Sequence, residues 1–156
     1  MGKSHNYSFN GITVTAYGFI KLPNNDIATD LYANNIISDK NGLGLAIDVD
    51  HEINKSTYIQ LDLSGIIHKL VDGSVPNITI KDIQKHEGFS LYGSNELGSR
   101  GVLLYSSNDS LPTQNVSIPF IDNYQFISIT ASGDLEGANV ILHSIDYDIC
   151  DTNPSN

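Results

Sequence analysis

Apolar and polar side chains alternate along short segments of the chain, and polar turns separate these segments. Because neighbouring side chains of a β-strand point to opposite faces, this period of two predicts strands with one buried face. In the clearest segment, residues 58–63, aliphatic side chains alternate with Tyr58, Gln60 and Asp62, which we expect to face water. Eight such strands are expected, at residues 13–19, 44–49, 58–63, 77–83, 89–92, 102–105, 126–131 and 138–145.

The segments between the predicted strands favour turns and loops. Residues 93–101 and 132–137 are rich in glycine or polar residues, and we expect each to close a hairpin. Residues 24–41 are expected to form a long loop, and the apolar spacing within 64–71 predicts one short helical turn. The chain is therefore predicted to be all-β, an antiparallel β-sandwich of jelly-roll type with about eight strands.

One domain accounts for the pattern. We expect the sandwich to cover residues 11–149, with residues 1–10 as an added or flexible N-terminal segment and residues 150–156 as a polar C-terminal tail. The one cysteine, Cys150, has no second cysteine with which to form an internal disulfide.

The charge of the chain narrows the classes of partner. The 156 residues include 18 acidic and 8 basic side chains, which give a formal charge of −10, and Arg100 is the one arginine. Few cations are present to displace counterions from phosphates, so nucleic-acid binding is not expected. No apolar segment approaches the roughly 18 residues that a membrane span requires, so we expect no membrane insertion of this segment.

Three carboxylates lie close together in the sequence, at Asp48, Asp50 and Glu52. On an extended chain all three would project to the same side and would repel one another without a cation. Ca²⁺ is a hard ion that binds six to eight oxygens, so the sequence makes calcium a candidate structural ion at these residues. The alternative is a solvated acidic edge.

No set of residues predicts catalysis. The five histidines have neither His-x-x-x-His spacing nor a Cys-x-x-Cys partner, and the Gly-x-Ser-x-Gly motif of serine hydrolases does not occur. His86 and Glu87 are the weak candidates for acid-base chemistry, but adjacent residues of a strand face opposite ways. We expect no catalytic residue and no enzyme activity.

Several segments resemble known families of β-sandwich domains. An aromatic-led strand at 58–64, an alternating strand at 78–80 and a strand that ends in Tyr92-Gly93-Ser94 follow one another as in galactose-binding-like jelly rolls such as discoidin domains. A wider set resembles exported bacterial domains that often precede a Pro-Glu-Pro (PEP-CTERM) sorting signal. These segments are 42–44, 50–53, 58–64, 87–89, 91–98, 126–131 and 139–142. The resemblance implies a secreted or cell-surface β-sandwich, although the sequence opens without a signal peptide.

The side chains best suited to bind a ligand are tyrosines. The chain has eight tyrosines and no tryptophan, and Tyr32, Tyr92 and Tyr105 lie close to polar loops, with Asn95 shortly after Tyr92 in the sequence. A tyrosine ring can stack on the apolar face of a sugar while asparagine binds the sugar hydroxyls. We therefore expect a non-catalytic extracellular or cell-surface module that binds carbohydrate or a matrix polymer. The alternative is a structural protein that assembles with itself or with another surface protein.

Overall fold

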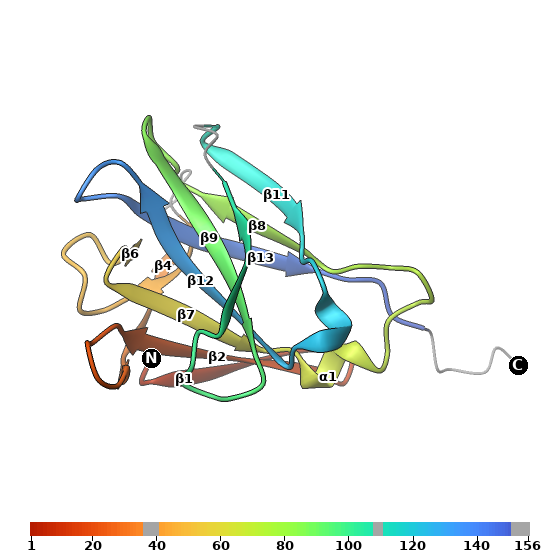
Figure 1. Ribbon diagram of the computed structural model, residues 1–156. Helices are drawn as coiled ribbons and strands as arrows, with labels where there is room; N and C mark the ends of the chain where they lie inside the picture. Colours follow the sequence, from red (N-terminus) through yellow and green to blue (C-terminus); the bar gives the residue numbers. More distant parts are fainter. Residues whose placement is uncertain (36–40, 108–110, 151–156) are drawn as a thin grey trace, which may run out of the picture.

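The computed structural model describes residues 1–35, 41–107 and 111–150. In it, two antiparallel β-sheets pack face to face, which confirms the predicted all-β sandwich (Figure 1). The described residues form thirteen strands rather than the eight expected. The elements are β1 (Ser4–Phe9), β2 (Ile12–Ile20), β3 (Ile27–Thr29), β4 (Leu31–Asn35), β5 (Asn41–Leu45), β6 (Ile53–Asn54), β7 (Thr57–Asp62), α1 (Ser64–Ile67), β8 (Asn77–Lys81), β9 (Glu87–Ser94), β10 (Val102–Ser106), β11 (Thr113–Ser117), the 3₁₀ helix η1 (Ile121–Asn123), β12 (Phe126–Gly133) and β13 (Asn139–Asp146).

The strands divide between the two sheets without regard to chain order. The first sheet has the order β1-β2-β7-β12-β9-β10, with β3 also paired to β2. The second sheet has the order β11-β8-β13-β5-β4, with β6 also paired to β13. The hairpin predicted at residues 93–101 is confirmed, because β9 and β10 pair antiparallel across it.

The hairpin predicted at residues 132–137 is wrong. Here the chain leaves β12 in the first sheet and enters β13 in the second. Both edges of β12 are already occupied, one by β7 and the other by β9, so β13 has no edge of β12 with which to pair. The short polar segment is therefore a crossing between layers.

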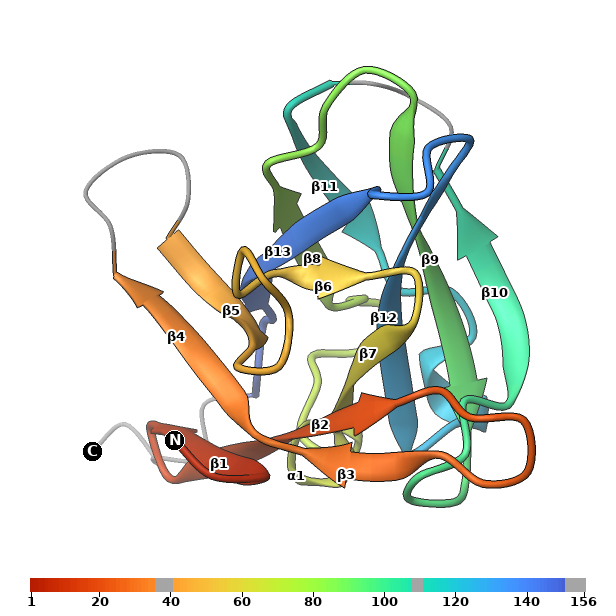
Figure 2. The same cartoon turned by 90° about the vertical axis from the view of Figure 1, so that its left-hand side faces the viewer.

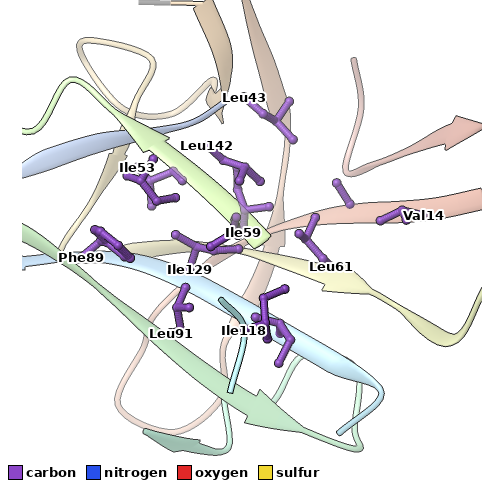
Figure 3. Packing of buried hydrophobic residues seen from close by; sticks show 14 of the residues in the cluster. Val14, Leu43, Ile53, Ile59, Leu61, Phe89, Leu91, Ile118, Ile129 and Leu142 are labelled. Carbon is purple, nitrogen blue, oxygen red and sulfur yellow. The ribbon is translucent and has the colours of Figure 1, made fainter. Parts of the chain in front are cut away.

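The core fills the space between the two sheets. Ile59 and Ile129 of the first sheet and Leu142 of the second belong to one cluster of buried side chains (Figure 3). Burial of each such side chain favours folding by about 1.5–3 kcal/mol. The aliphatic face predicted for the strand at residues 58–63 thus forms part of the core.

The opposite face of the first sheet does not meet water as predicted. Tyr58 and Gln60 are both 0% exposed. The Gln60 side chain donates to the carbonyl oxygen of Ser99 (2.9 Å) and accepts from the amide of Gly98 (2.8 Å). The β9–β10 connection therefore covers this face, and polar side chains tolerate burial there because hydrogen bonds satisfy them.

The N-terminus belongs to the sandwich, contrary to the prediction for residues 1–10. Ser4–Phe9 form β1, which pairs with β2 from Ser4 opposite Tyr17 to Phe9 opposite Ile12. Asn10 (φ 51°) and Gly11 (φ 76°) form the two-residue turn between them. Positive φ at both turn residues matches the right-handed twist of a hairpin, which explains the choice of Asn-Gly.

The predictions for the short helical turn, the long loop, the strand at 44–49 and the tail have different outcomes. The predicted short helical turn is confirmed as α1. The loop predicted over residues 24–41 is wrong for β3 and β4, while its residues 36–40 lie outside the described part of the chain. The strand predicted at 44–49 ends at Leu45, in β5. Residues 151–156 of the predicted tail also lie outside the described part, and Cys150 is exposed.

Candidate functional site

A groove of about 480 Å³ lies between the edge of the first sheet and the second sheet. We call it the inter-sheet groove. One wall comes from β1 and β2 at the start of the chain, and the other comes from β4, β5 and the end of β13. Figure 2 shows the β1–β2 hairpin along the lower part of the molecule, with β4 and β5 rising on the same side.

The floor of the inter-sheet groove is a continuation of the core. Val14, Leu43 and Leu61 line the groove and also belong to the buried cluster. Figure 3 places these three side chains at one end of that cluster. The floor offers aliphatic surface, so it suits an apolar face of a ligand.

Aromatic side chains of β1 form the wall beside this floor. Tyr7 lies opposite Val14 in the β1–β2 ladder, and Phe9 lies opposite Ile12. Directly opposed residues share a face of the sheet, so both rings lie on the core side. They remain 44% and 69% exposed, respectively. Partial burial raises the pKa of the Tyr7 hydroxyl, which therefore stays protonated and able to donate at neutral pH.

Polar groups line the second wall. The His143 ring nitrogen Nδ1 lies 3.0 Å from the carbonyl oxygen of Asn41. A carbonyl oxygen can only accept, so Nδ1 carries the proton and Nε2 of the neutral ring is an acceptor. The neighbouring Ser144 hydroxyl donates to Asp146 (3.1 Å), so it too can accept a hydrogen bond. The inter-sheet groove thus pairs an aliphatic floor and aromatic wall with a polar rim.

The structure does not bring the four predicted ligand-binding residues into one site. Tyr32 lies in β4 of the second sheet, whereas Tyr92 and Tyr105 lie in β9 and β10 of the first. Asn95 follows β9, and none of the four residues lines the inter-sheet groove.

Each of these four side chains has a structural neighbour. The Tyr32 ring stacks on His51 with 4.1 Å between ring centroids, and the Tyr105 ring lies 5.7 Å from Phe89. The guanidinium of Arg100 lies 5.9 Å from the Tyr92 ring centroid. Asn95 joins two loops, because it accepts from the amide of Gln125 (2.9 Å) and donates to the carbonyl oxygen of Asn123 (3.1 Å).

The segment with the three predicted calcium ligands is a series of turns. It does not have the extended form assumed, since β5 ends at Leu45. Asp48, Asp50, Glu52 and Glu136 nevertheless line one hollow of about 240 Å³, together with Lys55.

Asp48 already has protein partners at both carboxylate oxygens. They accept hydrogen bonds from the Asn54 side chain (2.6 Å) and from the Thr57 hydroxyl (2.8 Å). Burial raises the pKa of Asp48. Over the part of the chain that the structure describes, no group of three or more His, Cys, Asp or Glu side chains is placed to hold a metal ion. Calcium at this turn stays a prediction.

The aromatic wall was not predicted, because Tyr7 and Phe9 were expected to lie outside the domain. The signal that could have found them is Asn10-Gly11, flanked by alternating residues on both sides. Such a dipeptide is a strong local indication of a hairpin, and it would have joined residues 4–9 to the first strand.

Comparison of the chain with family models, with curated proteins and with solved structures found no match. Among the described residues, no helix is both long and apolar enough to cross a membrane.

Proposed function

We propose that this protein is a non-catalytic module of the cell surface or extracellular space that binds carbohydrate, as part of a glycan or matrix polymer, in the inter-sheet groove. The observation that supports this role is the exposed pair Tyr7 and Phe9 beside a groove with a polar rim. The secreted or cell-surface setting follows only from the resemblance noted in the sequence.

A sugar ring has an apolar face of C–H groups and a rim of hydroxyls. The apolar face can stack on the Tyr7 and Phe9 rings, while hydroxyls at the opposite side meet Asn41, His143 and Ser144. A volume of about 480 Å³ falls within the range of roughly 300–1,000 Å³ typical of small-ligand sites. Because the chain carries a charge of −10, neutral or cationic glycans are favoured over polyanionic ones.

The proposal predicts that Tyr7→Ala weakens glycan binding. An aromatic contact contributes about 0.5–1.5 kcal/mol beyond its buried area, so we expect affinity to fall by about tenfold. Glycans bound by the wild-type protein on an array, and displaced by free sugar, would supply the ligand for titration calorimetry. The matched control is Tyr32→Ala, which removes an exposed tyrosine outside the groove and should leave affinity unchanged.

Two results would overturn this proposal. One is an array on which the folded wild-type protein binds no glycan. The other is equal affinity of the wild-type protein, Tyr7→Ala and Phe9→Ala for a glycan that does bind. Circular dichroism would establish that each variant keeps its β structure.

A further inference from the structure

The outer edge of β1 has unpaired main-chain groups. The carbonyl oxygen of Lys3 accepts from the amide of Gly18 in β2 (3.2 Å), whereas that of Gly2 points away and accepts from Leu31 (2.8 Å). Because main-chain direction alternates along a strand, the amides and carbonyls of Ser4, Asn6 and Ser8 point away from β2. No described strand pairs with β1 on that side, and all six of its residues are exposed.

Two of the other outer strands, β10 and β11, carry features that hinder pairing. The β10 ladder has a bulge between Leu103 and Tyr105. β11 is bounded by Pro112, directly before its first residue, and by Pro119 shortly after its end. Bulges and prolines are common means of protecting an edge, and β1 contains neither.

Charge also distinguishes this edge. Residues 1–25 contain two lysines and no acidic residue, so all 18 acidic side chains lie in the rest of the chain with the other six basic ones (8 minus 2). The outward row Ser4, Asn6 and Ser8 is small, polar and uncharged. A second copy of this chain can approach here without bringing carboxylates together.

We propose that two copies of the chain associate by antiparallel pairing of their β1 strands. The two-fold axis passes beside Asn6, so that Asn6 faces Asn6 of the second copy and Ser4 faces Ser8. This register uses the outward main-chain groups of both strands and makes the contact isologous. The pairing does not depend on the carbohydrate proposal.

The pairing would change the inter-sheet groove. A two-fold axis between antiparallel strands of a continuous sheet stands perpendicular to that sheet, so both second sheets lie on the same side of it. The two grooves then open toward each other, with Tyr7 and Phe9 of both copies between them. Tyr7 of one copy comes opposite His5 of the other, so the second copy contributes side chains to the same wall.

Sedimentation velocity of the unliganded protein tests the pairing, from low micromolar to millimolar concentration at low and high salt. We expect a monomer–dimer equilibrium that salt strengthens, because screening reduces repulsion between two copies of charge −10. Asn6→Pro removes an outward amide N–H and leaves the main-chain hydrogen bonds between β1 and β2 in place. Asn6→Lys places two lysine side chains opposite each other across the two-fold axis, where their charges repel. Each should weaken dimerisation at least tenfold.

The matched control is Thr13→Lys. This variant adds the same charge on the same face of the sheet, but in β2 rather than in β1. It removes the Ser8–Thr13 side-chain hydrogen bond, and Asn6→Lys likewise removes the Asn6–Thr15 side-chain hydrogen bond. This control should dimerise as the wild-type protein does. A wild-type protein that stays monomeric throughout would overturn the proposal, as would dimerisation of folded Asn6→Lys equal to that of the control. If Asn6→Pro fails to fold, the sedimentation of Asn6→Lys alone tests the proposed pairing.

Discussion

Buried polar side chains fix the loops that cover the outer face of the first sheet. Tyr58 is fully buried, and its hydroxyl lies 2.9 Å from Asp26 and 3.1 Å from the carbonyl oxygen of Gly98. Arg100 lies 3.6 Å from Asp26 and beside the Tyr58 ring. Burial, followed by the hydrogen bond to Asp26, raises the pKa of Tyr58. These contacts hold the β2–β3 and β9–β10 loops against strand β7. Their role is therefore structural, and it requires no ligand.

Lys21 gives this face a pH dependence. Its ammonium donates to the carbonyl oxygen of Lys55 (2.7 Å) and to the Thr130 hydroxyl (2.6 Å). Burial, and then the charge of Arg100, lower the pKa of Lys21 from 10.5 to about 8. Between these two values the unfolded chain binds more protons than the folded one, so the contribution of Lys21 to stability increases as the pH rises through this window.

We expect the unfolding free energy of the wild-type protein, minus that of Lys21→Met, to increase from pH 8 to pH 10. Urea denaturation at several pH values measures it, and tyrosine ionisation cancels in the difference. Lys69→Met, which removes a charge from an exposed position, is the control. A difference that stays constant with pH would show that Lys21 keeps its proton in the folded state.

Strands with alternating aliphatic side chains were predicted well from the sequence, whereas polar strands were predicted poorly. β7, β8, β12 and β13 contain alternating isoleucine, leucine or valine, and each was found near its predicted position. β1, β4 and β11 are rich in asparagine and serine, which also favour turns. Their extended form depends on pairing with a neighbour, and that neighbour is not encoded in the local pattern.

The turn between β1 and β2 depends on glycine at its second position. Gly11 has φ +76°, a left-handed conformation that costs a non-glycine residue about 1–2 kcal/mol. Gly11→Ala should therefore destabilise the β1–β2 hairpin by about that amount and speed hydrogen exchange in β1. Gly137→Ala is the control, since its added methyl group meets open space without a positive φ. Unchanged exchange in β1 of Gly11→Ala would contradict the role assigned to the turn.

The candidate site could not be predicted from the sequence, because segments far apart in the chain form it. Tyr7 and His143 line the same groove from opposite ends of the chain. The sequence predicted that exposed tyrosines and polar side chains would form the binding surface, but it could not say which ones the topology unites. Likewise, the covering of Tyr58 and Gln60 depends on a loop some forty residues away, at Gly98 and Ser99.

The calcium hypothesis is also tested on the whole molecule. An ion that binds the folded chain alone raises its melting temperature by mass action, so millimolar Ca²⁺ should raise it relative to a chelator. Mg²⁺ controls for general screening of a chain of charge −10. Asp50→Asn should abolish the Ca²⁺ effect if the turn at residues 48–52 holds the ion. Equal melting temperatures in Ca²⁺ and in chelator would show that these carboxylates are solvated and hold no calcium ion.

The place of β13 has a consequence for synthesis. This strand lies at the middle of the second sheet, between β8 and β5, yet it is the last of the described strands to be synthesised. A nascent chain that has not yet produced residues 139–146 has no strand to join β4 and β5 to β8 and β11. The second sheet therefore closes only after β13 has been made, and until then the inner face of the first sheet needs protection from aggregation.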